Sequence, residues 1–77
     1  MIKILLFAEL QEQTGLDEIS VDKAGLTVSE LKTWLMENYE LPTLNNSMIA
    51  INESYASETD RLKDGDIIAF IPPVSGG

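Results

Sequence analysis

The sequence has 77 residues, 13 acidic and 5 basic side chains and a formal net charge of −8, which disfavours a nucleic-acid partner because phosphate binding needs clustered Lys and Arg. It contains neither cysteine nor histidine, which excludes thiol nucleophiles, thiolate metal sites and the usual general base near neutral pH. A chain of this length forms one small domain, and without a recognisable signal peptide or an apolar run of ~20 residues we expect it in the cytoplasm.

Three short elements are predicted before residue 22. Residues 2–7 are mostly apolar, which indicates a buried strand. Residues 8–15 are rich in helix formers and end in Gly15, so a short helix with a glycine cap is expected there. Residues 16–21 alternate apolar and polar side chains towards their end, which predicts a half-exposed strand antiparallel to the first.

The next segment carries the clearest helix pattern. Thr27-Val28-Ser29-Glu30 is a capping box, in which the threonine caps the first turn and the glutamate reaches back to its amide. Trp34 is predicted to be core or core edge rather than a binding aromatic, and Pro42 forbids continuation of the helix. Helical spacing places four apolar residues on one face: Val28, Leu31, Leu35 and Tyr39.

The remaining segments are shorter. A polar loop, a third strand and a tight turn with a short fourth strand are assigned in order to residues 43–47, 48–52 and 53–56. Residues 62–66 form a turn in which Gly65 supplies a positive φ, and Asp64 and Asp66 are interpreted as turn formers rather than as an acid–base pair. Residues 67–71 are apolar at every position, which favours a central strand.

The order of these elements predicts a topology. The first and last strands are both apolar, so both favour the centre of the sheet. A right-handed crossover through the 27–39 helix then gives a mixed sheet of four to five strands with that helix on one face. This is an α+β fold of the β-grasp (ubiquitin-like) type. We assign residues 1–71 to the domain and residues 72–77 to an extended C-terminal tail.

The tail combines rigidity with small size. Pro72 and Pro73 favour an extended backbone and lack amide donors, so they end the strand and act as a semi-rigid spacer. Gly76 and Gly77 have no Cβ and can pass through a channel too narrow for other residues. Extended at ~3.3–3.6 Å per residue, the tail reaches roughly 20 Å. It is either an end made for insertion into a partner or an ordinary flexible terminus.

The acidic balance has two interpretations. It keeps a small domain dissolved, or it steers the domain towards a basic docking surface on a protein partner. No side chain after Asp66 is charged, so the tail is neutral while the body is acidic. Solubility accounts for most of the charge, and this contrast slightly favours an additional role in steering.

The ending resembles that of a known family. Residues 62–77, Leu-Lys-Asp-Gly-Asp-Ile-Ile-Ala-Phe-Ile-Pro-Pro-Val-Ser-Gly-Gly, match the pattern L-x-D-G-D-x-[IV]-A-x-x-P-P-V-[ST]-G-G. The chain thereby resembles the small (sulfur-carrier) subunit of molybdopterin synthase, the MoaD type of ubiquitin-like sulfur carrier, over essentially its whole length. Phe7-Ala8, Gly15 and Asn52 also fit. Glu9-Leu10-Gln11-Glu12 departs from the pattern, because many members carry a basic residue there, and this puts any polar partner contact of that segment in doubt.

The resemblance implies a carrier rather than an autonomous enzyme. A partner enzyme would use ATP to adenylate the Gly77 carboxylate, and a sulfur donor, a sulfurtransferase, would then convert it to a thiocarboxylate. The large subunit of molybdopterin synthase would receive the tail and supply the catalytic groups. Sulfur would pass to the cyclic pyranopterin precursor, cyclic pyranopterin monophosphate, in molybdenum cofactor biosynthesis. Family members assemble as a heterotetramer, and this scheme gives the chain itself no bound cofactor or metal and neither a nucleic-acid nor a membrane partner.

The resemblance also implies partner-binding residues. They are Phe7, Phe70, Pro72, Pro73, Val74, Ser75 and Gly76. Whether Phe70 packs in the core or meets the partner is open from the sequence. Two other functions are open as well. The chain could be another ubiquitin-like sulfur carrier, serving thiazole synthesis or tRNA thiolation, or a protein modifier that forms isopeptides through Gly77.

Overall fold

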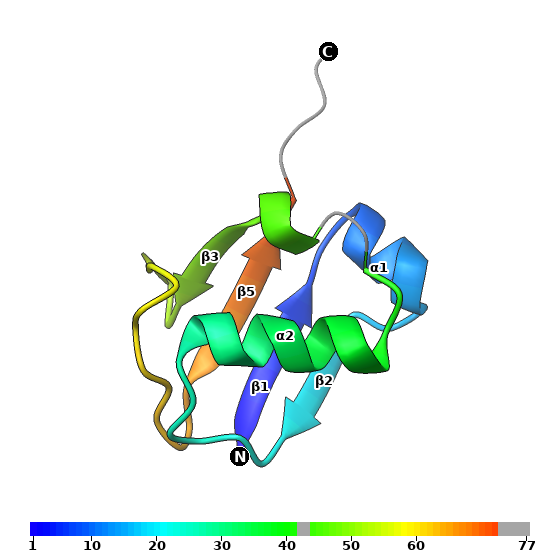
Figure 1. Ribbon diagram of the computed structural model, residues 1–77. Coiled ribbons are helices and arrows are strands. Elements are labelled where there is room, and N and C mark those ends of the chain that lie inside the picture. The colour runs from blue at the N-terminus through cyan, green and yellow to red at the C-terminus, as the bar shows by residue number, and fades with distance from the viewer. Residues whose placement is uncertain (42–43, 73–77) are drawn as a thin grey trace.

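The computed structural model describes residues 1–41 and 44–72. Within these residues, five strands form one mixed sheet in the order β2-β1-β5-β3-β4, and α2 crosses one of its faces (Figure 1). The strands are β1 (Ile2–Leu6), β2 (Glu18–Val21), β3 (Met48–Ile51), β4 (Ser54–Tyr55) and β5 (Ile67–Ile71). The helices are α1 (Glu9–Thr14) and α2 (Val28–Asn38), with a 3-10 turn at Leu44–Asn46. The predicted α+β order is confirmed.

β5 is the central strand, as its apolar sequence predicts. It pairs in parallel with β1, where Lys3 lies opposite Ile67, and antiparallel with β3, where Met48 lies opposite Ile71. β2 then pairs antiparallel with β1 at one edge and β4 pairs with β3 at the other. The first and last strands are therefore neighbours in the middle of the sheet (Figure 1).

α2 begins at the predicted capping box. The Glu30 amide donates to Thr27 Oγ1 at 3.2 Å, and the Thr27 amide donates to Glu30 Oε1 at 2.9 Å. These two hydrogen bonds satisfy donors that the first turn of a helix otherwise leaves unpaired. At the other end Tyr39 is the cap residue, and Trp34 meets its ring edge-to-face at a centroid distance of 6.2 Å. Trp34 is half-buried against the core, so its assignment to the core edge is confirmed.

The hydrophobic core lies between α2 and the sheet. Burying each large aliphatic or aromatic side chain contributes about 1.5–3 kcal/mol. The buried apolar residues are Ile2, Ile4, Leu6, Leu10, Ile19, Val21, Val28, Leu31, Leu35, Leu41, Leu44, Ile49, Leu62, Ile68 and Phe70. Leu44 shows that the stretch expected as a polar loop also anchors the core through its 3-10 turn. Lys32 of α2 is also buried, although it is charged, and its Nζ lies 2.6 Å from Glu58 Oε1.

The 62–66 turn has the role that its composition predicts. Gly65 adopts φ 91°, a left-handed conformation that glycine takes without strain. Asp66 Oδ2 accepts a hydrogen bond of 2.8 Å from the Lys63 amide, and Asp64 pairs with the amino terminus of Met1. Asp66 therefore stabilises the turn, as predicted, while Asp64 binds the start of the chain.

Candidate functional site

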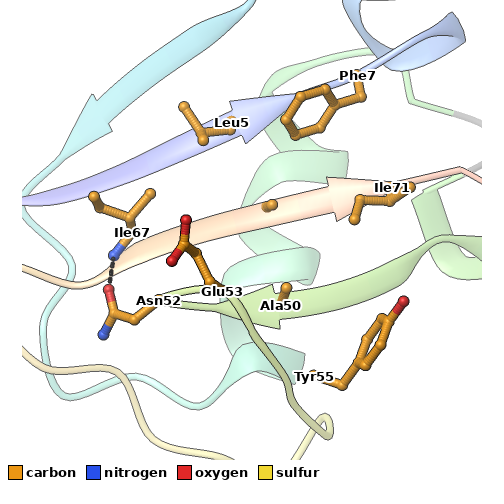
Figure 2. Close-up of a pocket in the computed structure, with 9 residues that line it drawn as sticks. Leu5, Phe7, Ala50, Asn52, Glu53, Tyr55, Ile67 and Ile71 are labelled. Atoms are coloured by element: carbon orange, nitrogen blue, oxygen red, sulfur yellow. Dashed lines mark hydrogen bonds between the residues drawn. The ribbon is translucent and has the colours of Figure 1, made fainter.

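The face of the sheet opposite α2 is uncovered by the described residues and is apolar. Strand alternation sends Ile68 and Phe70 of β5 into the core and sends Ile67, Ala69 and Ile71 to the other side. The same alternation on the neighbouring strands completes what we call the open sheet face: Leu5, Phe7, Met48, Ala50, Tyr55, Ile67, Ala69 and Ile71. Figure 2 shows these side chains, other than Met48 and the unlabelled Ala69, on one side of the strands with α2 behind.

Several large side chains of this face are in contact with solvent. Tyr55 is 78% exposed, Met48 48%, Phe7 44% and Ile67 41%. Tyr55, Phe7 and Ile67, together with their smaller neighbours, surround a shallow hollow of about 670 Å³. Contiguous exposed apolar surface of this kind is typical of protein–protein docking sites, because a monomer gains nothing by leaving it in water.

Two residues at the rim of the open sheet face have an unusual backbone. Asn52 and Glu53 join β3 to β4 with φ values of 50° and 71°, in the left-handed region. Asn52 is held there by its own side chain, whose Oδ1 accepts from the Ile67 amide at 3.0 Å (Figure 2). Its Nδ2 donates to Asp66 at 2.9 Å. The Asp66 carboxylate accepts hydrogen bonds from the Lys63 amide and from the Asn52 side chain. Both lower the pKa of the Asp66 carboxyl, and the Lys63 amide has the larger effect.

The predicted partner-binding residues fall into three groups. Phe7 lies on the open sheet face, where a partner can reach it. Phe70 is fully buried in the core, which answers the open question and corrects its placement among the partner-binding residues, because a side chain without exposed surface cannot contact a docked protein. Pro72 is buried after β5. Pro73, Val74, Ser75, Gly76 and Gly77, like Pro42, lie outside the described residues.

Most of the open sheet face was not predicted from the sequence. Its residues Leu5, Met48, Ala50, Tyr55, Ile67, Ala69 and Ile71 were not among the candidates. A usable pattern was present, since residues 67–71 are apolar at every position while the chain predicts only one main helix to cover the sheet. A strand that is apolar on both faces, in a sheet with one covering layer, has to expose one of those faces.

The described residues present an exposed apolar surface that is suited to recognition of a partner. The chain has no histidine or cysteine, and no group of three or more His, Cys, Asp or Glu within residues 1–41 and 44–72 could hold a metal ion. Over the same residues, no helix has the length and apolar character needed to cross a membrane. The open sheet face ends at Ile71, one residue before the predicted tail, so docking this face also positions the start of the tail.

Comparison with known proteins identifies the family. The ThiS family model matches residues 4–77. The chain belongs to the ThiS family. One curated relative is the molybdopterin synthase sulfur carrier subunit of Anopheles gambiae, which is 40% identical over 83 aligned positions that cover 99% of this chain and 91% of the relative. The resemblance inferred from the ending of the sequence is confirmed.

Solved structures confirm the β-grasp (ubiquitin-like) fold. SAMP1, the small archaeal modifier protein 1 of Haloferax volcanii, superposes with a TM-score of 0.83 at 26% identity, over 99% of this chain and 98% of its own. A protein–protein complex of subunits 1 and 2 of the molybdopterin-converting factor from Helicobacter pylori 26695 contains a chain with a TM-score of 0.73 at 29% identity, over 99% of this chain and 97% of that one. This structurally similar chain was therefore solved in complex with a second subunit.

Proposed function

We propose that this chain is the sulfur-carrier subunit of a molybdopterin synthase and that Gly77 is its reacting residue. The observation that carries this proposal is the similarity to the Anopheles gambiae sulfur carrier subunit across almost the whole chain, at 40% identity. The Pro-Pro-Val-Ser-Gly-Gly ending supports the same assignment, because two glycines without Cβ atoms let a chain end enter a narrow active site.

The chemistry proposed for Gly77 starts from a carboxylate, which is a poor electrophile. On an adenylating enzyme, this carboxylate attacks the α-phosphorus of ATP, releases pyrophosphate and becomes an acyl-adenylate. The outer sulfur of a persulfide on a sulfurtransferase then displaces AMP and forms an acyl disulfide. A thiol reduces this disulfide, which releases the sulfurtransferase and leaves a thiocarboxylate. On the synthase the thiocarboxylate gives its sulfur to the cyclic pyranopterin precursor, and water returns the chain end to a carboxylate. Covalent activation of this kind replaces one difficult step by several easier ones.

The described residues contribute docking to this scheme. The open sheet face is the surface proposed to bind the large subunit, and the Helicobacter pylori complex supports a second subunit as the partner. β5 links docking of the open sheet face to placement of the C-terminal tail, because it contributes Ile67, Ala69 and Ile71 to the face and then leads into the tail. Acid–base groups are assigned to the partners, since the chain has no histidine or cysteine.

Intact-mass measurement tests the proposal. The chain is produced with and without the adenylating enzyme and sulfur donor of its source, and the C-terminal peptide is then sequenced. We expect a species heavier by the exchange of one oxygen for one sulfur at Gly77, and this species should support molybdopterin formation when the large subunit and the precursor are added. An unmodified mass under both conditions would refute the assignment.

A protein modifier is the second candidate, and one observation favours it. SAMP1 of Haloferax volcanii, named a modifier protein, matches the fold over 99% of this chain. In this role the same activated Gly77 forms an isopeptide with a lysine of another protein. The two functions are separated by what accumulates after activation, because a modifier gives conjugates of higher mass with a Gly-Gly-modified lysine, whereas a carrier gives a free thiocarboxylate.

A further inference from the structure

Positive φ values outside glycine occur, in the part of the chain that the structure describes, only beside the open sheet face. They belong to Ala8, which follows Phe7, and to Asn52 and Glu53, which line the hollow. Residues other than glycine and asparagine are rarely found in this region, because Cβ meets the neighbouring carbonyl. Such strain gathers at functional sites, where the backbone conformation serves a purpose other than stability.

Glu53 lacks the compensation that explains its neighbour. A two-residue connection with both φ values positive strongly favours Asn-Gly, and this chain has asparagine at the first position but glutamate at the second. The Asn52 side chain stabilises its own conformation through hydrogen bonds to Ile67 and Asp66. Among the hydrogen bonds and ion pairs formed within residues 1–41 and 44–72, none involves the Glu53 carboxylate.

Glu53 is also the charged member of an apolar surface. The other residues around the hollow are apolar apart from Asn52 and the hydroxyl of Tyr55. Figure 2 shows the Glu53 carboxylate in front of β5, on the same side of the sheet as Ile67. Lys3 and Glu18, which alternate onto this side of the sheet near its β2 edge, lie 3.9 Å from each other, so each has an opposite charge nearby. Glu53 has no such neighbour among the residues that line the hollow.

We propose that Glu53 is a specificity-determining residue, whose carboxylate pairs with a basic side chain on the protein that docks on the open sheet face. This inference rests on the proposed function, since the occupant is the large subunit of the synthase. Charge complementarity supports it, because an unpaired carboxylate beside an apolar surface is desolvated when a partner docks and needs a cation opposite it. The strained glutamate in place of glycine then has a reason, which is to hold this charge over the face.

The test compares the affinity of the unaltered chain and three variants for the large subunit of the same source, by titration calorimetry at low and high salt. Glu53→Gln keeps the shape of the side chain and removes its charge, and Glu53→Gly places the preferred residue in the turn. Glu37→Gln is the matched control, because Glu37 is an exposed residue of α2, on the opposite side of the sheet.

We expect Glu53→Gln and Glu53→Gly to weaken binding at low salt by roughly tenfold or more, with a smaller difference at high salt, and Glu37→Gln to bind as the unaltered chain does. Glu53→Gly should also unfold at the same temperature or higher, a result that a purely structural role for Glu53 does not predict. Unchanged binding by Glu53→Gln at both salt concentrations would overturn this inference alone. No binding by the unaltered chain would overturn the proposed function, and this inference with it.

Discussion

Phenylalanine occurs at two positions in this chain, and the structure gives the two rings opposite roles. Phe70 is fully buried in the central strand, whereas Phe7 is 44% exposed on the open sheet face. Phe70→Ala removes a core ring and should lower the free energy of unfolding by about 3–5 kcal/mol. At roughly 0.05–0.15 kcal/mol per residue, a domain of this length has about 4–12 kcal/mol in total, so this one change removes a large share.

Phe7→Ala should affect partner binding rather than stability. Its ring is already largely in water, so we expect the free energy of unfolding to fall by less than about 1 kcal/mol. Affinity for the large subunit should fall by roughly tenfold or more, because aromatic side chains at the centre of an interface carry much of its binding energy.

Both quantities are measurable on the same preparations. Urea unfolding is followed by the fluorescence of Trp34, the single tryptophan, which is half-buried at the core edge. Binding is followed by calorimetry with the large subunit. Phe70→Leu serves as the control, since a large apolar side chain in the same place should cost only about 1–1.5 kcal/mol. The assignment of the two rings would be refuted if Phe7→Ala destabilised the chain as much as Phe70→Ala.

Three further results are expected. Thr27→Ala removes the cap of α2 and should cost about 1 kcal/mol in urea unfolding while leaving sulfur transfer unchanged. Hydrogen bonds, from the Lys63 amide first, hold the pKa of Asp66 below its ordinary value of 3.8. The stability that they provide is present above that pH and is lost as the pH falls below it. Asp66→Asn should therefore reduce the loss of stability at acidic pH, measured as the free energy of unfolding against pH. Removal of Gly77 should abolish thiocarboxylate formation, measured by intact mass, while the free energy of unfolding stays within about 0.5 kcal/mol.

Local patterns in the sequence predicted the elements well because each rests on short-range physics. The Thr27-to-Glu30 capping box, the positive φ of Gly65 and the order of the strands are all found in the structure. Each depends on a few neighbouring residues or on the apolar content of one segment. The ending of the chain is specific enough to indicate the family from its residues alone.

The sequence does not predict which side chains of β5 face the core and which face away from α2. Every residue from Ile67 to Ile71 is apolar, so alternation gives no sign of which side faces α2. The sequence therefore leaves Phe70 open between core and interface, and the pairing with β3 places it opposite Ile49, on the core side. The conformation of Glu53 was also missed, because glutamate is not a residue that predicts a left-handed turn.

The parallel pairing of β1 with β5 joins the two strands that are made first and last. Contacts between residues so distant in sequence raise the contact order. The chain must lose the conformational entropy of bringing β1 and β5 together before the middle of the sheet can form. On a ribosome, the sheet therefore stays without its central strand until β5 has emerged. A nascent or truncated chain that lacks β5 also lacks the middle of the open sheet face, to which β5 contributes Ile67, Ala69 and Ile71. Folding itself thus ensures that only a chain synthesised through β5 presents the docking face.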